Sequence, residues 1–420
     1  QLMLRVQTEF QVEIPLTVLF ESATLTNLAQ QIELQIEQKI ELQQVDRVTR
    51  VAKASVSMAS VSMTPVSTHP IPVIARDRTP IPLSFAQQRL WFLQALEPQS
   101  TAYNLPGGVR LQGVLNHTAL ERALATIVER HEALRTTFDY QDGAPVQRIE
   151  PSGQWKLSTT DLSHLDSDAQ TLAVTQLTDE TVQQPFDLTC DPLLRCHLVT
   201  LSEQAHVLLF CTHHISSDGW SINLLLQELV RLYEDFCAGR AASLQPLPVQ
   251  YADFTVWHRA WLQGEVLQQQ LDYWQKQLEG APALLELPTD RPRPATQTVN
   301  GARLYQPLSR ELTKKINQLG QQSGATLFMV LLTGFNLLLS RYSGQLDISV
   351  GSTIANRPHP QLEKLIGVFL NTLVLRSDLS GDPTVMELLK RVKTTALEAY
   401  QYQNVPFEQV DALNPARDMS

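Results

Sequence analysis

The sequence predicts an α/β protein with two lobes. From residue 81 onward, amphipathic segments with apolar residues at helical spacing alternate with short apolar segments typical of buried strands. These roughly 340 residues exceed what one hydrophobic core usually serves. Prolines gather between about residues 245 and 300, in QPLPV and LPTDRPRP. We therefore expect a first lobe over residues 81–250 and a second lobe over residues 251–420.

Composition is that of a globular protein with a large core. Of the 420 residues, 43% are hydrophobic and 18% are charged, and the formal net charge is −10. This acidic balance argues against nucleic acid or an anionic membrane surface as the main partner. The longest apolar stretch, residues 327–339, is shorter than the 20 or so residues of a membrane span, so we expect a core helix there. Four cysteines without a CxxC pair, and no visible export signal, indicate a cytoplasmic protein.

The first 80 residues differ from the rest. LMLRVQTEF and TLTNLAQQIELQI have the apolar spacing of two helices, but 40 residues are too few for an independent core. We expect residues 1–40 to be the back half of a small helical domain. Residues 41–80 contain no Phe, Trp, Tyr or Gly, and their Ser/Val/Met/Pro bias predicts a linker between domains. The repeated SVSM within them could instead form a short strand.

Periodicity places the elements of the two lobes in order. Amphipathic helices are expected at 118–134, at 221–236 and within 312–342, and strands at 206–212, 346–352 and 367–379.

The densest group of chemically active side chains is THHISSDGWS, residues 212–221, between a predicted strand and a predicted helix. In an extended segment His213 and His214 point to opposite faces, so only one of them can face a given cleft. We predict that this histidine is a general base or a hydrogen-bonding catalyst. Asp218 is expected to organise the loop, although it could equally cap the helix that follows. Gly219 would supply a close backbone approach or an unusual φ.

The sequence lacks the motifs that several other reaction types require. There is no G-x-S-x-G, GxGxxG or GxxxxGK[ST] segment, which disfavours a serine hydrolase and a nucleotide site. His214 and Asp218 are four residues apart, but no third ligand lies nearby, so we expect no metal. Cys211 follows an apolar run without a nearby cation and is expected to be buried and inert. Of the reaction types considered, the residues still allow base-assisted acyl transfer without a covalent enzyme intermediate.

HHISSDGWS resembles the HHxxxDG signature of condensation domains of nonribosomal peptide synthetases, which are relatives of chloramphenicol acetyltransferase. Residues 1–40 are similar to the last helices of a peptidyl carrier domain, whose phosphopantetheine-bearing serine would lie upstream of residue 1. The second lobe is expected to be truncated, since the family continues beyond ARDMS. Five more segments resemble other blocks of the family, in the same order: SFAQQRLWFL (84–93), RHEALRTTF (130–138), YADFTVW (251–257), IGVFLNTLVLR (366–376) and YQNVPFE (402–408).

The resemblance implies two chloramphenicol-acetyltransferase-like lobes forming a V with a central tunnel, preceded by the short helical carrier remnant. Upstream and downstream peptidyl carrier domains would bring donor and acceptor thioesters on 4′-phosphopantetheine, with an adenylation domain as neighbour. The acceptor amine would attack the donor carbonyl and form a peptide bond, with an L-configured donor. The alternatives are an epimerisation domain and an inactive recruitment domain of the same fold. No metal, nucleotide, nucleic acid or membrane is expected to take part.

The resemblance also implies roles for single residues. His214 would be the catalytic imidazole, acting as a base or by positioning the amine. His213 would be structural and packed. Asp218 would fix the loop through an ion pair, for which Arg357 in GSTIANRPHP is the candidate. The residues expected beside the substrate tunnel are Gly219, Trp220 and Ser221.

Overall fold

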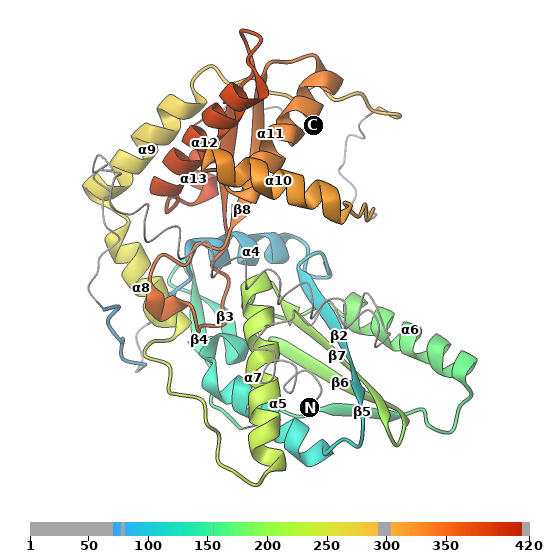
Figure 1. The fold of residues 1–420 in the computed structure, drawn as a ribbon. Coiled ribbons are helices and arrows are strands. Elements are labelled where there is room, and N and C mark those ends of the chain that lie inside the picture. Colours follow the sequence, from blue (N-terminus) through green and yellow to red (C-terminus); the bar gives the residue numbers. More distant parts are fainter. Residues whose placement is uncertain (1–69, 77–79, 154, 293–303, 414–420) are drawn as a thin grey trace, which may run out of the picture. The chain divides into compact units, whose positions relative to one another are not determined.

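The computed structural model describes residues 70–76, 80–153, 155–292 and 304–413 (Figure 1). They belong to a single compact unit. The expected carrier helices at 1–40 and most of the expected linker at 41–80 lie outside the described residues. Helices and strands alternate through the rest of the chain, which confirms the predicted α/β class.

The first lobe is built on a four-stranded sheet with the order β2-β7-β6-β5, in which only the β5–β6 pair is parallel (Figure 1). Apolar side chains of two helices pack with those of β6 and β7, because both helices have an apolar stripe. A third helix packs by the other sheet face, beside Val199 and Val207. The strands are β2 (Asn104–Gln112), β5 (Ser158–Asp161), β6 (Leu194–Ser202) and β7 (Ala205–His213), and the helices are α5 (His117–Arg130), α7 (Gly219–Cys237) and, on the other face, α6 (Ser167–Gln183).

A smaller three-stranded sheet, with the order β1-β4-β3, extends this lobe. Ser84 begins the helix α4 with a reciprocal capping box that includes Gln87. The elements are β1 (Ile81–Pro82), α4 (Phe85–Leu96), η1 (Glu132–Arg135), β3 (Thr136–Gln141) and β4 (Ala144–Ile149).

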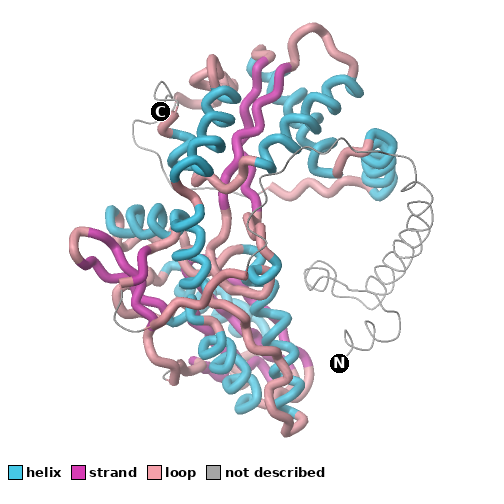
Figure 2. Tube along the Cα trace, turned by 90° about the vertical axis from the view of Figure 1, so that its left-hand side faces the viewer, coloured by secondary structure: helices cyan, strands magenta, loops and turns pink. Residues whose placement is uncertain are grey.

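The second lobe has an antiparallel pair of strands flanked by helices (Figure 2). Its core includes Trp274, Ile348, Leu373 and Val392. The elements are α9 (Gly264–Leu278), α10 (Arg310–Ser323), α11 (Leu327–Ser343), β8 (Asp347–Ile354), η2 (Pro360–Leu362), β9 (Asn371–Asp378), α12 (Val385–Gln401) and α13 (Phe407–Asp411).

The boundary expected at residues 250 and 251 stays a prediction, but the packing of the next two helices bears on where the core changes. Helix α8 (Tyr251–Trp261) packs Tyr251 and Phe254 against Leu83 and Cys211 of the first lobe. The next helix, α9, contributes Trp274 to the core of the second lobe. By packing, the changeover therefore falls between α8 and α9.

The helix expected at 327–339 is present as α11, but only one of its faces lies in the core, which corrects the expectation of a core helix. Met329, Leu332 and Leu339 are buried, but Phe335 and Leu338 on the other face are about half exposed. An apolar composition cannot say whether one face or both will be covered. Among the described residues no single helix has the length and hydropathy of a membrane span; only α10 and α11 together meet that test, across a bend of 106°.

Candidate active site

His214 lies on the turn between β7 and α7 and lines a cavity. Its backbone N–H donates to Tyr103 O at 2.8 Å. Its ring Nδ1 lies 2.8 Å from the carbonyl oxygen of Ser217. Because a carbonyl oxygen can only accept, Nδ1 carries the hydrogen in the neutral ring and Nε2 carries the lone pair. No other described residue bonds Nε2, so this turn presents a basic nitrogen of fixed orientation.

His213 faces the opposite way, as the alternation along a strand predicts. Its side chain is fully buried. The N–H of Ile215 donates to Nδ1 at 3.1 Å, and Nε2 lies 3.4 Å from Oε1 of Gln94. Burial, with a smaller contribution from His214 and Arg195, lowers the pKa of His213 to about 4. This neutral, packed ring has the environment of a structural histidine.

Asp218 both caps the helix and organises the loop, so the two alternatives from the sequence coincide. Its buried carboxylate accepts the N–H and the hydroxyl of Ser221 at 2.8 and 2.7 Å, which satisfies the first turn of α7. Its other oxygen accepts the N–H of Phe369 at 3.1 Å. The expected ion pair is present: Arg357 Nη2 lies 3.2 Å from Oδ1.

Arg357 is buried rather than on the surface, with 3% of its side chain exposed. Nη1 donates to the carbonyl oxygens of Leu362 and Leu365 at 2.6 and 2.8 Å. The guanidinium carbon lies 3.9 Å from the centre of the Phe369 ring. Burial lowers the pKa of Arg357, and the charge of Asp218 opposes that effect. The arginine therefore joins the helix start to the chain at 362–369.

Side chains of the first lobe hold this 362–369 segment by its backbone. The Ser221 hydroxyl accepts the N–H of Gly367 at 3.1 Å, and the indole N–H of Trp220 donates to Glu363 O at 2.9 Å. The N–H of Ile366 donates to Nδ1 of the buried His131 at 3.4 Å. The strand expected at 367–379 therefore begins only at Asn371, because the backbone before it bonds to side chains instead of a neighbouring strand.

Tyr251 makes a further contact between the first lobe and the 362–369 segment. Burial raises the pKa of its phenol, which therefore stays neutral and donates to Val368 O at 2.6 Å. The phenol oxygen of Tyr251 also lies 2.8 Å from Oγ of Ser84, at the start of α4. The ring fills the space above Gly367 so closely that a Cβ there would lie 2.1 Å from Cδ2 of Tyr251. Gly367 is thus required by packing.

The three residues expected beside the tunnel have different environments. Gly219 is exposed, its φ is not positive, and an added Cβ would meet no atom within 4 Å. The expected unusual φ was therefore wrong, whereas the close approach of a ligand to this backbone stays a prediction. Trp220 is 47% exposed. Ser221 is fully buried and bonds to Asp218, so its placement beside a tunnel was wrong.

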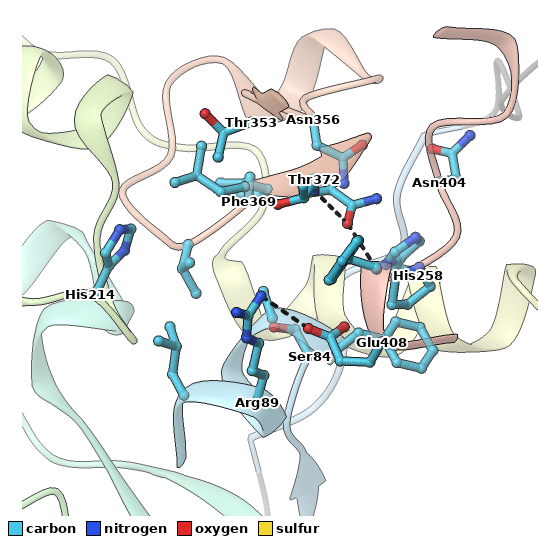
Figure 3. A pocket seen from close by; sticks show the side chains of 18 of the residues that line it. Ser84, Arg89, His214, His258, Thr353, Asn356, Phe369, Thr372, Asn404 and Glu408 are labelled. Atoms are coloured by element: carbon cyan, nitrogen blue, oxygen red, sulfur yellow. Dashed lines mark hydrogen bonds and ion pairs between the residues drawn. The ribbon is translucent and has the colours of Figure 1, made fainter. Parts of the chain in front are cut away.

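The cavity beside His214 has a volume of about 260 Å³ (Figure 3). It is lined from both lobes: by α4 and α8, by the ends of β8 and β9, and by the chain before α13. Arg89 and Glu408 pair across it at 3.3 Å, with both side chains partly exposed. Their segments, SFAQQRLWFL and YQNVPFE, were identified from the sequence, but no residue of either was expected in the site. The polar lining side chains labelled in Figure 3 are Ser84, Arg89, His214, His258, Thr353, Asn356, Thr372, Asn404 and Glu408.

Cys211 does not compete with His214 as a reactive group. It is fully buried, and burial raises the pKa of its thiol to about 11. The expectation of a buried cysteine is confirmed.

Comparison with known proteins identifies the family. The profile of the Condensation domain family matches residues 77–420. This chain belongs to the condensation-domain family. Subunits D and B of the linear gramicidin synthase of Brevibacillus parabrevis are 45% and 52% identical to it over 97% and 81% of this chain. The chain spans only 8% and 7% of the lengths of these two subunits.

A solved structure supports the same assignment. The X-domain from teicoplanin biosynthesis superposes with a TM-score of 0.73 at 30% identity, over 82% of this chain and 75% of that one. The predicted chloramphenicol-acetyltransferase-like fold of a condensation domain is confirmed, and so is its assignment to the nonribosomal peptide synthetases.

Proposed function

We propose that this condensation domain forms a peptide bond by joining two carrier-bound substrates at His214. The observation that carries the proposal is the fixed orientation of the His214 ring. Ser217 O holds Nδ1–H at 2.8 Å, so the lone pair of Nε2 is available in the cavity. A base in that position can accept a proton from an attacking amine or hold the amine in line.

The amine nitrogen of the acceptor forms a bond to the carbonyl carbon of the donor thioester. The carbon–sulfur bond breaks, and the proton lost by the nitrogen passes, by way of Nε2, to the departing thiolate. The products are an amide on the acceptor carrier and a free thiol on the donor carrier. Asp218 supports this step from a distance: its carboxylate bonds to Ser221, Phe369 and Arg357, and so fixes the loop that carries His214.

Gly219 has a role in this proposal because the fold does not require a glycine there. Neither φ nor packing excludes a side chain at this position. We propose that the open space beside Gly219 admits the substrate on its way to His214, with Trp220 at its border. A large side chain would obstruct that path.

The partners follow from the same proposal. Donor and acceptor carrier domains bring their thioesters on 4′-phosphopantetheine, and an adenylation domain is the neighbour in the synthetase. The donor has the L configuration. The reaction takes place in the cytoplasm. The match to the condensation-domain family and the similarity to synthase subunits support this assignment.

The test mixes the protein with a donor-loaded carrier and an acceptor-loaded carrier and follows the mass of each carrier by intact-protein mass spectrometry. Wild type and the surface control His164→Ala should move the donor mass onto the acceptor carrier. His214→Ala should do so at least about 100-fold more slowly with an unchanged Tm. Equal transfer by His214→Ala would remove that residue from the mechanism. A change in chirality without mass transfer would indicate epimerisation, and retention of another protein without either reaction would indicate recruitment.

A further inference from the structure

Asn404 has a buried amide oxygen that accepts no hydrogen bond from the described residues, and it lies at the side of the cavity away from His214 (Figure 3). We infer that it binds a secondary amide of the thioester substrate that reacts at His214, on either side of the thioester, an inference that rests on the proposed function. The ligand class is an extended chain with an amide group several bonds from the reacting carbonyl.

The buried oxygen of the Asn404 amide is unbonded among the described residues. The residue is only 5% exposed, and its Oδ1 has no partner. Leaving a buried polar group unpaired costs about 1–3 kcal/mol, which a ligand that bonds to it would recover. Most of the other buried amides of the chain are bonded at one end at least; Asn371, for example, is bonded at both.

The loop around Asn404 is fixed by its own backbone contacts. Nδ2 of Asn371 donates to the carbonyl oxygens of Gln403 and Val405 at 2.8 and 2.6 Å. Oδ1 of Asn371 accepts the N–H of Phe407 at 3.1 Å. The backbone N–H of Asn404 itself donates to Oε1 of Gln270 at 3.2 Å. With the backbone held on both sides, the side chain is preorganised toward the cavity.

The lining around Asn404 matches a neutral polar chain. Asn356, in the same cavity, also has an unpaired Oδ1 and is held at a φ of 45°, which few residues other than glycine adopt. Thr353 and Thr372 add hydroxyl groups. The two charged side chains, Arg89 and Glu408, neutralise each other. Amides and hydroxyls over apolar walls complement the N–H and C=O of an amide better than a charged group.

Two sources supply such an amide: the pantetheine arm itself and the peptide bonds of a peptidyl group. Pantetheine and N-acetyl-alanyl-alanine methylamide serve as separate probes, and a thiol-ended triethylene glycol of similar length, without an amide, is the control ligand. Ligand-observed NMR titration on the 420-residue chain gives the Kd of each probe without any turnover. Binding of one probe, or of both, identifies the source.

We expect Asn404→Leu to weaken binding of the amide probe by about 3- to 10-fold, the effect of one neutral hydrogen bond, and to leave the glycol unaffected. The Tm of Asn404→Leu should be unchanged or higher, because an apolar side chain of similar size replaces an unpaired polar one. Asn404→Asp keeps the size but loses the N–H donors and should also bind more weakly. Asn223→Leu, on the exposed face of α7, is the matched control and should bind like wild type.

Equal affinity of wild type and both Asn404 variants, or failure of both amide probes to bind wild type, would overturn the inference. So would a lowered Tm of Asn404→Leu with unchanged affinity, since that result belongs to a structural residue. Because binding is measured without turnover, Asn404-dependent binding in a protein that transfers no mass would refute the proposed function alone. Mass transfer with Asn404-independent binding would refute this inference alone.

Discussion

Nη2 of Arg357 lies 3.2 Å from Oδ1 of Asp218, and almost nothing of either side chain reaches solvent. The pair connects two points 139 residues apart in the sequence. Each partner has further hydrogen bonds: Asp218 to Ser221 and Phe369, and Arg357 to Leu362 and Leu365. The orientation of the His214 loop therefore depends on a buried charge pair.

Asp218→Ala should lower both the Tm and the rate of condensation. It leaves the Arg357 charge buried without a partner, which costs about 3–5 kcal/mol, or roughly 10 °C in Tm. Differential scanning calorimetry measures the change. Glu311→Ala, which breaks the exposed pair with Lys315, should shift the Tm very little. An unchanged melting curve for Asp218→Ala would contradict the organising role.

Acid should destabilise the protein through His213. Its pKa is about 4 in the folded state, against about 6.5 when unfolded. Above pH 6.5 the ring is neutral in both states and the stability is complete. As the pH falls from 6.5 to 4, only the unfolded state takes up the proton, so the free energy of unfolding decreases by about 3 kcal/mol in total. His258, whose pKa burial also lowers to about 4, adds a similar loss.

Urea unfolding at a series of pH values tests this linkage. His213→Gln should reduce the slope of unfolding free energy against pH by about one proton between pH 4 and 6.5. His164→Gln, at an exposed site, should leave the slope as in wild type. A slope in His213→Gln equal to that of wild type would mean that His213 titrates normally in the folded protein.

Gly219→Trp should abolish condensation while the Tm stays within a few degrees of wild type. A Cβ added at Gly219 meets no atom within 4 Å, so we expect the new side chain to obstruct the path of the substrate and not the fold. Gly334→Trp is the matched control, because Gly334 is an equally open and exposed helical glycine, but lies on α11 and not next to the His214 turn. Carrier-to-carrier transfer followed by mass spectrometry separates the two variants, and normal transfer by Gly219→Trp would contradict its placement.

Gly367→Ala should destabilise the protein by about 1–3 kcal/mol, because the new methyl group overlaps the ring of Tyr251. The displaced segment includes Val368 and Phe369, which line the cavity, so the transfer rate should decrease as well. Gly351→Ala provides the comparison, since its Cβ would lie in ordinary contact, 3.6 Å from Thr372. In a double-mutant cycle, Gly367→Ala and Tyr251→Ala should be non-additive, and additive losses would show that the ring is not the obstacle.

The strand-to-helix corner was predictable because periodicity marks both of its sides. The apolar run before Thr212 and the stripe after Ser221 locate the turn, and alternation separates His213 from His214. The wrong placement of Ser221 has a geometric reason. Successive helical side chains turn by about 100°, so Gly219, Trp220 and Ser221 cannot line the same wall.

The remaining features depend on contacts between distant segments. No local pattern shows that Tyr251 packs over Gly367, or that Asn371 bonds the loop of Asn404 and leaves that amide oxygen unpaired. The exposed face of α11 could not be predicted either, because the hydropathy of a segment does not show which other elements pack against it. Arg357 was reached only through the family resemblance.

The attachment of the His214 loop to the 362–369 segment also sets an order in time. A growing chain that has just made Asp218 must add another 139 residues before Arg357 exists, and 151 before Phe369 does. At ribosomal speeds that interval is on the order of ten seconds. During synthesis His214 is thus present well before the contacts of Asp218 that fix its loop. The nascent domain should gain its reactive geometry late, after most of the second lobe has left the ribosome.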